Sequence, residues 1–234
     1  LWLSEGLTPH WSSGGFMSSS KVDGPLHFGT QQQFLVRNAE LAQGADGKNM
    51  NYVFVGVSNA PSNSTDGRIS TIDATPRVAE KPYLVERLGA WSICVPQFVY
   101  GAVGIANSTA CERSVPMADV YVARAGDTAA TINAGLAAKS ALLLTPGLYE
   151  LDAPIVLQAD GFVVLGLGFA TLLATSGLPA LVVAGAGVRL GGVFLEAATA
   201  ADAPPTEPLL VWKGDGGVGS DLFTRVAALA YSTP

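Results

Sequence analysis

The second half of the chain is a succession of short apolar segments separated by turns that are too short to hold a helix. The expected strands lie at residues 141–144, 154–157, 162–167, 171–174, 180–184, 188–195, 209–212 and 222–229. Their connections, such as "ADG", "GLG", "TSGLP" and "GAG", hold three to five residues. A crossover helix between parallel strands needs about a dozen residues or more. The strands must therefore return without helices between them.

A right-handed parallel β-helix meets this requirement. Each coil lays a few residues on each of three sheets and stacks its apolar interior on the next coil. The segments also lack the strict alternation of apolar and polar residues that is typical of a sheet with one solvent-exposed face. The two most similar, "GFVVLGLG" from Gly161 and "GVRLGGVFLE" from Gly187, begin 26 positions apart, a suitable length for one coil. We therefore predict an all-β fold with a parallel β-helix from about residue 140 to 230.

One short helix is expected where this solenoid begins. The stretch "AATINAGLAAK" has helical composition, and Asp127 or Thr128 can cap its start. Lys139 lies near its end, where a cation is favoured. The sequence therefore predicts a capping helix near residues 128–139.

The first half of the chain has a different texture. Alternating segments such as "MNYVFVGV" and "WSICVPQFVY" stand between long polar loops. This pattern indicates an irregular antiparallel β region. We therefore predict an irregular β-rich region at residues 1–118 and the N-terminal coils of an incomplete β-helix at residues 119–234.

Composition excludes several classes of partner. Only 14% of the 234 residues are charged, well below the usual quarter or so, so much of the chain packs against itself or a neighbour. The net charge is −6 and there is no basic run, so a nucleic acid backbone would be repelled. No apolar run approaches the roughly 20 residues that a membrane-spanning helix needs. The chain is therefore expected neither to bind nucleic acid nor to span a membrane.

Two features indicate an oxidising, extracellular compartment. Asn63 and Asn107 each begin an "NST" acceptor for N-linked glycan in a polar loop. Cys94 and Cys111 are the only cysteines, and one disulfide between them is the favoured interpretation, with two buried free thiols as the alternative. Neither cysteine lies in a CxxC motif or near a histidine, so neither is interpreted as a metal ligand or nucleophile. We predict a secreted or cell-surface glycoprotein.

Several motifs resemble known β-helix proteins. "AGDTAATINAGL" followed by "LLLTPGLYEL" resembles the first segment of pectate-lyase-like (pectin-lyase-like) β-helix proteins. "QQQFLVRN", "NMNYVFVG", "DATPRVAEKP" and "VVLGLGFATL" resemble segments of secreted proteins that carry a coagulation factor 5/8-type label and are similar to β-helical β-1,3-glucanases. The resemblance implies a carbohydrate-directed protein of which this chain is a fragment. It also implies that the catalytic residues lie on later coils, so none is assigned here.

The visible residues offer few groups for chemistry. Glycoside hydrolysis needs two carboxylates across a groove. Glu150 and Glu196 lie at strand ends and could point outward on one sheet, although solvated turn carboxylates are the alternative. Trp212 could stack on a sugar if it were exposed, with core packing as the alternative. These three residues are the candidate glycan contacts, and the sequence predicts no metal site and no cofactor.

Two functions from different classes remain. The first is a polysaccharide-binding or polysaccharide-processing protein, a glycoside hydrolase or lyase whose active coils lie beyond Pro234. The second is a non-catalytic structural glycoprotein of a cell surface, wall or filament, which packs against its own copies or other surface proteins. Resemblance supports the first. The low charge content, the two glycan acceptors and the lack of a catalytic pair support the second.

Overall fold

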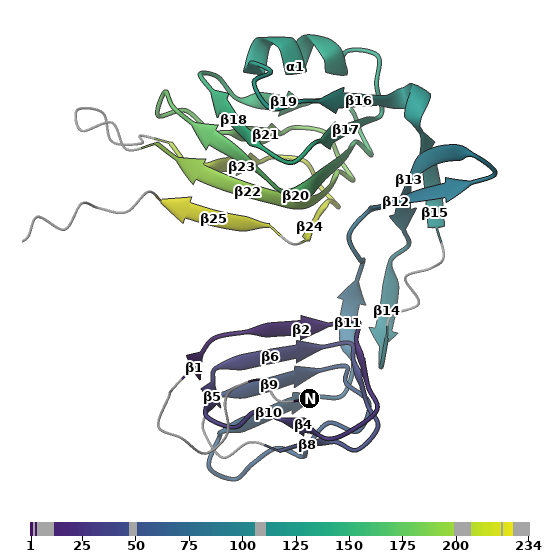
Figure 1. The fold of residues 1–234 in the computed structure, drawn as a ribbon, viewed down its shortest axis with the longest axis vertical. Coiled ribbons are helices and arrows are strands. Elements are labelled where there is room, and N and C mark those ends of the chain that lie inside the picture. Colours follow the sequence, from purple (N-terminus) through teal and green to yellow (C-terminus); the bar gives the residue numbers. More distant parts are fainter. Residues whose placement is uncertain are drawn as a thin grey trace, which may run out of the picture. The chain divides into compact units, whose positions relative to one another are not determined.

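The computed structural model describes residues 1, 3, 12–46, 51–105, 111–198, 207–220 and 222–226. The chain forms two compact units, and each is built around parallel β-strands (Figure 1). Unit 1 comprises Leu1–Glu80 and Gln97–Ala110, and unit 2 comprises Lys81–Pro96 and Cys111–Pro234. The chain therefore passes from one unit to the other three times.

Unit 1 is a narrow parallel β-solenoid. Its strands are β1 (Ser12–Ser13), β2 (Phe16–Ser18), β3 (Lys21–Val22), β4 (Leu26–His27), β5 (Gln31–Gln32), β6 (Phe34–Arg37), β7 (Glu40–Leu41), β8 (Ala45–Asp46), β9 (Tyr52–Val55) and β10 (Ile69–Ile72). Strands β2, β6, β9 and β10 form one sheet, and the pairs β1–β5, β3–β7 and β4–β8 form three others, all parallel. Phe16 pairs with Leu35, 19 positions on, and Tyr52 pairs with Ile69, 17 positions on. These two steps set the length of one coil.

The prediction of antiparallel pairing is wrong for these strands. Along β9, Tyr52 and Phe54 are buried while Val53 and Val55 are partly exposed. This alternation is typical of an antiparallel sheet with one wet face, but a solenoid wall has the same inside and outside. Periodicity therefore identified the strands without giving the direction in which they pair.

Aromatic rings fill the interior of unit 1. The ring of Phe28 stacks on Tyr52 with centroids 4.4 Å apart, and it meets Phe34 and Phe54 edge-on at 5.4 and 6.0 Å. The Tyr52 hydroxyl donates to the Gln31 carbonyl over 2.5 Å, so its buried polar tip is satisfied. A few large side chains are enough for such a narrow coil.

Antiparallel pairing begins only after these coils. In unit 1, β11 (Thr75–Val78) pairs with β14 (Val99–Ala102). In unit 2, β12 (Tyr83–Arg87), β13 (Ala90–Pro96) and β15 (Cys111–Pro116) form a three-stranded antiparallel sheet. A disulfide joins Cys94 of β13 to Cys111 of β15, with their Cα atoms 5.4 Å apart, which confirms the favoured pairing.

Unit 2 contains the predicted parallel β-helix. Its strands are β16 (Val120–Ala123), β17 (Ala141–Leu144), β18 (Leu148–Leu151), β19 (Ile155–Leu157), β20 (Val163–Ala174), β21 (Leu181–Val183), β22 (Arg189–Ala197), β23 (Leu210–Trp212), β24 (Val218–Ser220) and β25 (Phe223–Val226). The first sheet runs β16-β17-β20-β22-β24, the second contains β18, β20, β22 and β25, and the third runs β19-β21-β23. Every pairing among them is parallel.

The coils of unit 2 are wider than those of unit 1 and lengthen along the chain. Val120 pairs with Ala141, 21 positions on, and Leu181 pairs with Leu210, 29 positions on. Between them, Val163 pairs with Arg189, which is the spacing expected from Gly161 and Gly187. Strand β20 joins two predicted strands, β18 and β24 were not predicted, and residues 227–229 of the last predicted strand lie outside the described residues.

The expected helix covers the first coil. Helix α1 (Ala129–Leu136) has Thr128 as its N-cap, whose hydroxyl accepts from the Thr131 amide over 3.2 Å. The Asp127 carboxylate accepts instead from the Arg124 amide, so Thr128 is the cap of the two candidates. The helix ends at Leu136, and the Lys139 amine beyond it donates to the Ala118 carbonyl over 2.7 Å. None of the helices in the described part of the chain is long and apolar enough to cross a membrane.

A second core lies on the outer side of the first sheet of unit 2. It joins residues of β13 and β15 with residues of β16, β17 and β20, namely Ile93, Val95, Val115, Val120, Ala141, Leu143, Val163 and Leu165. The three-stranded antiparallel sheet therefore covers this face. Strands β13 and β15 do not extend this core over the second sheet, whose outward side chains are partly or largely exposed.

Candidate functional site

The second sheet of unit 2 brings two of the candidate glycan contacts together. Strand register aligns Glu150 of β18 with Leu173 of β20, and Leu173 with Glu196 of β22. Their neighbours Tyr149, Leu172 and Leu195 are buried in the solenoid interior. Because side chains alternate along a strand, Glu150, Leu173 and Glu196 form one outward column.

The two carboxylates are spaced along the solenoid axis. Two steps of about 4.8 Å between neighbouring strands place the backbones of Glu150 and Glu196 roughly 10 Å apart. Glu150 is exposed, Glu196 is half-buried, and Leu173 stands between them. A carboxylate accepts hydrogen bonds from hydroxyl groups. On the far side of Glu196 the register continues to Arg225 of β25. The column therefore carries two spaced carboxylates along the axis, rather than one compact acid pair.

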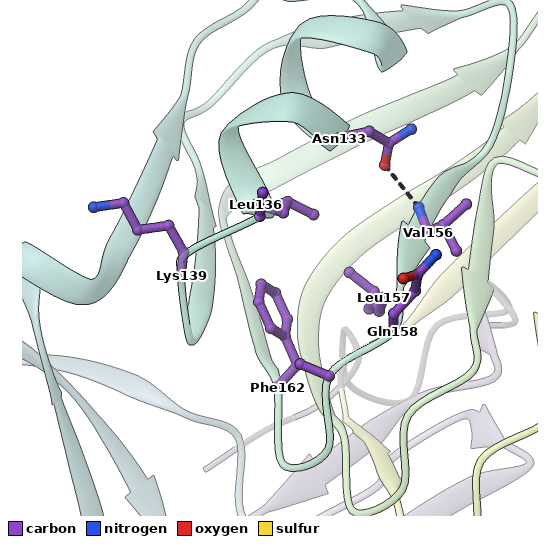
Figure 2. A pocket seen from close by; sticks show the side chains of 9 residues that line it. Asn133, Leu136, Lys139, Val156, Leu157, Gln158 and Phe162 are labelled. Carbon is purple, nitrogen blue, oxygen red and sulfur yellow. Dashed lines mark hydrogen bonds between the residues drawn. The ribbon is translucent and has the colours of Figure 1, made fainter.

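A pocket lies at the end of α1, on the side of the third sheet (Figure 2). Its volume is about 560 Å³, and its lining residues are Asn133, Leu136, Ala137, Lys139, Val156, Leu157, Gln158, Ala159 and Phe162. Leu136, Leu157 and Phe162 are buried and supply the apolar part of its walls. Sequence analysis did not identify this pocket, because its two sides come from separate stretches of the chain that only the fold brings together.

Two of the polar side chains of the pocket, Asn133 and Lys139, form hydrogen bonds with backbone groups. The Asn133 amide donates to the Pro154 carbonyl over 2.9 Å. Its oxygen accepts from the Val156 amide, also over 2.9 Å (Figure 2). Asn133 thus joins α1 to β19, and Lys139 is engaged by Ala118. Gln158 is exposed at the rim. The lining of the pocket is divided about evenly between polar and apolar atoms. Because its Asn133 and Lys139 side chains already have backbone partners, the outward sheet face is the better candidate site.

Trp212 lies apart from the two glutamates. It ends β23 on the third sheet, is partly buried, and packs against the aliphatic core of unit 2. Its indole N–H donates to the Gly214 carbonyl over 2.9 Å. These contacts agree with the alternative that Trp212 is a packing residue.

Of the two predicted glycan acceptors, the structure describes Asn63 but not Asn107. Asn63 is exposed, and its side chain pairs with the backbone of Thr71, accepting from the amide over 2.6 Å and donating to the carbonyl over 3.4 Å. Asn107 lies outside the described residues. Glycosylation at both positions stays a prediction.

Two tyrosines of unit 2 have raised pKa values. The Tyr149 hydroxyl donates within a network formed by the carbonyls of Ala123 and Thr145, and burial raises its pKa. Burial also raises the pKa of Tyr121, and the nearby charge of Asp127 adds to this shift. Both tyrosines therefore remain neutral at physiological pH, and Tyr149 is a hydrogen-bonding core residue. Among the described residues, no three His, Cys, Asp or Glu side chains gather as a metal site would require.

Comparison with known proteins found one matching domain family, a curated relative and two solved structures. Residues 120–225 match the LAM55 pectate lyase-like domain. Over 215 residues, 90% of its length, the chain is 34% identical to an exo-beta-1,3-glucanase of Streptomyces sp. (strain SirexAA-E / ActE). The structure of sacteLam55A from Streptomyces sp. SirexAA-E superposes with a TM-score of 0.79 and 30% identity over 92% of this chain. A variant of sacteLam55A in complex with glucose superposes with a TM-score of 0.77, at 31% identity over 92% of this chain.

The similarity covers only part of these relatives. The chain spans 34% of the length of the glucanase and 40% of each sacteLam55A chain. The shared part includes both units, since it reaches nine tenths or more of this sequence. The two solenoids are therefore a common feature of this chain and its relatives.

Proposed function

We propose that this protein takes part in the hydrolysis of β-1,3-glucan and that residues 1–234 supply glycan-binding solenoids. The observation that carries this proposal is the 34% identity over 90% of the chain to an exo-beta-1,3-glucanase. A structural relative that was crystallised with glucose supports the choice of a neutral sugar as ligand. The acidic net charge of −6 also disfavours a polyanionic polysaccharide.

The outward column of unit 2 provides the binding groups in this proposal. Glu150 and Glu196 accept hydrogen bonds from sugar hydroxyl groups, while Leu173 contacts the less polar part of the sugar. Hydrolysis itself requires a general acid and a second carboxylate that face each other across the glycosidic bond. Because the chain spans about a third of the glucanase, we assign no catalytic residue to it and give Glu150 and Glu196 a binding role.

We further propose that the protein works outside the cell. A disulfide such as Cys94–Cys111 persists in oxidising compartments and is rare in the cytosol. Detection of the protein in the growth medium of its source, with the cysteines resistant to alkylation until reduced, would support this location. Purely cytosolic protein with alkylated thiols would contradict it.

Hydrolysis of β-1,3-glucan is tested with the protein in its natural length. Laminarin is the β-1,3-glucan substrate, and soluble β-1,4- and α-1,4-glucans are the controls. We expect release of glucose from laminarin alone. Absence of any product from laminarin, with binding also absent, would overturn the proposal and favour a structural role for the solenoids.

The binding role is tested on residues 1–234 by affinity electrophoresis in gels that contain laminarin. We expect Glu150→Gln and Glu196→Gln together to weaken retention about tenfold, because hydrogen bonds to charged groups contribute about 1.5–3 kcal/mol. Glu207→Gln with Asp215→Asn, which changes two exposed carboxylates outside the column, is the matched control. Equal loss in the control would show that net charge, rather than the column, governs retention.

A further inference from the structure

The corner between the first and second sheets of unit 2 holds a phenylalanine in an unusual backbone conformation. Phe169 has φ +56°, directly after Gly168 with φ +57°. A bulky residue in this left-handed region is strained, and such strain often marks a functional site. The ring is also 58% exposed, so burial does not offset the cost. Neither folding preference nor core packing accounts for phenylalanine at this position.

Strand register explains how the corner protrudes. Leu165 pairs with Gly191 and Ala170 pairs with Val193, so four residues, Gly166 to Phe169, stand opposite the single Gly192 of the next coil. Gly166 and Gly192 approach so closely that a Cβ atom on either would collide with the backbone of the other. The additional residues therefore cannot stay within the sheet and bulge outward, carrying Phe169 with them.

Phe169 reaches across one coil to a second exposed ring. It lies edge-to-face with Phe223 of β25, with ring centroids 5.3 Å apart and an interplanar angle of 75°. Phe223 is 46% exposed, and in the register it follows Phe194, which in turn follows Thr171. The Thr171 hydroxyl donates to the Phe169 carbonyl over 3.1 Å. Phe169, Phe194 and Phe223 together form what we call the aromatic shelf.

The aromatic shelf adjoins the glutamate column. Phe194 and Glu196 are two positions apart on β22, so their side chains emerge on the same face of the second sheet. Glu150 stands in the same relation to Leu148 on β18. The face therefore presents exposed rings beside the Glu196 carboxylate, on strands β20, β22 and β25 (Figure 1).

We propose that the aromatic shelf and the adjoining Glu196 bind hexose units of a neutral β-linked glucan. A β-glucopyranose with equatorial hydroxyl groups has two apolar C–H faces and a polar rim. The C–H face packs on a phenylalanine ring, while the hydroxyl rim donates to the carboxylate. The identity of the glucan rests on the proposed function, whereas the place of the site rests on the geometry of Phe169 and Phe223.

Binding of laminarihexaose to residues 1–234, followed by calorimetry, tests the aromatic shelf. We expect Phe169→Ala and Phe223→Ala each to weaken binding about tenfold, since each removes most of a ring that would be buried by the sugar. Trp91→Ala is the matched control, because Trp91 is 53% exposed but lies on β13, outside the second sheet. The control should bind like the unmodified chain.

Phe169→Gly separates binding from folding. Glycine adopts a positive φ without strain, so this variant should melt at a temperature equal to or above that of the unmodified chain while it loses affinity. A phenylalanine with only a structural role would lose melting temperature instead. Loss of stability with unchanged affinity would overturn the site.

The remaining outcomes keep this inference distinct from the proposed function. If the natural-length protein hydrolyses laminarin but all three phenylalanine variants bind laminarihexaose normally, the aromatic shelf is overturned and the function stands. If the chain binds no glucan and the same variants instead abolish self-association in size-exclusion chromatography, the face is a protein contact and the proposal is overturned. Selective loss in the phenylalanine variants, with Trp91→Ala intact, supports it.

Discussion

The two solenoids solve the same folding problem at two different widths. Both stack parallel strands coil upon coil, but a strand pairs with its neighbour 17 to 19 positions on in unit 1 and 21 to 29 positions on in unit 2. In unit 1 the interior is filled by rings around Phe28. In unit 2 it is filled largely by Leu, Ile, Val and Ala side chains. The comparison teaches that coil length decides which side chains can fill the interior at native density.

The surface of unit 2 shows what such a solenoid covers and what it leaves accessible. Helix α1 covers the first coil, and the antiparallel β12-β13-β15 sheet covers the outer side of the first sheet. Such covers protect strand edges and apolar faces from non-specific association. The second sheet of unit 2 keeps its outward rings and carboxylates accessible. The face left accessible by these covers is therefore the one to which we assign binding.

The largest expected effect is on the aromatic core of unit 1. Phe28→Ala removes the ring that contacts Tyr52, Phe34 and Phe54, and should destabilise unit 1 by about 3–5 kcal/mol. Hydrogen exchange measured by mass spectrometry should accelerate in peptides of β2–β10 and not in those of β16–β22. Phe16→Ala, which truncates an exposed ring, is the control. Equal acceleration in both units would show that they share one cooperative core and would break the comparison.

The disulfide should stabilise unit 2 almost as strongly. Cys94→Ser with Cys111→Ser opens a link between residues 17 positions apart, for which loop closure predicts a loss of about 3 kcal/mol. We expect hydrogen exchange to become faster first in β13 and β15. Exchange in β16–β22 should then also become faster, because the core on their outer side is no longer covered. Reduction of the unmodified protein should reproduce this result. A change confined to β2–β10 would contradict the assignment of the disulfide to unit 2.

Removal of the Asn133 side chain tests the helical cap of unit 2. Asn133→Ala leaves the partly buried Val156 amide, in the middle of β19, without its hydrogen-bond partner and should cost about 1–3 kcal/mol. The denaturation midpoint of unit 2 should fall, and the amide hydrogens of α1 should be the first to exchange faster. Gln158→Ala, at the exposed rim of the same pocket, should leave stability unchanged. A shift as large in the control would mean that the pocket, and not the Asn133 hydrogen bonds, stabilises α1.

The smallest expected effect is a pH dependence confined to unit 2. Burial raises the pKa of Tyr149 above its ordinary value of 10.0, and the pKa of Tyr121 shifts in the same direction. Because the pKa of each tyrosine is higher in the folded state than in the unfolded state, each stabilises the fold fully below about pH 10. This stabilisation is lost as the pH rises through the folded-state pKa. Tyr149→Phe should lower the free energy of unfolding by about 1 kcal/mol at neutral pH. It should also reduce the loss of stability at alkaline pH. Denaturation curves at about pH 8 and about pH 11 measure both, and an unchanged alkaline loss in the variant would assign it to other groups.

Local sequence was sufficient for much of unit 2. Connections of three to five residues exclude crossover helices, so the parallel β-helix could be predicted without knowledge of any contact. The cap at Thr128 and the pairing of Cys94 with Cys111 also depend on short stretches or on a single available partner. In unit 1, by contrast, alternation along segments such as Tyr52–Val55 is the same for a parallel solenoid and an antiparallel sheet. Pairing direction is set by contacts between coils, which periodicity does not contain.

Only the tertiary structure decided the geometry of the candidate site. The spacing read from the sequence holds for Val163 and Arg189 on the first sheet, yet Ala170 and Val193 on the second sheet are closer together along the chain. The corner between them absorbs the difference by displacing residues around Phe169 from the sheet, and it does so because the glycines of two coils meet there. This shift places Glu150 and Glu196 in one column and brings Phe169 to Phe223. Local sequence determined that a solenoid forms, whereas the packing of one coil on the next determined which side chains meet on its surface.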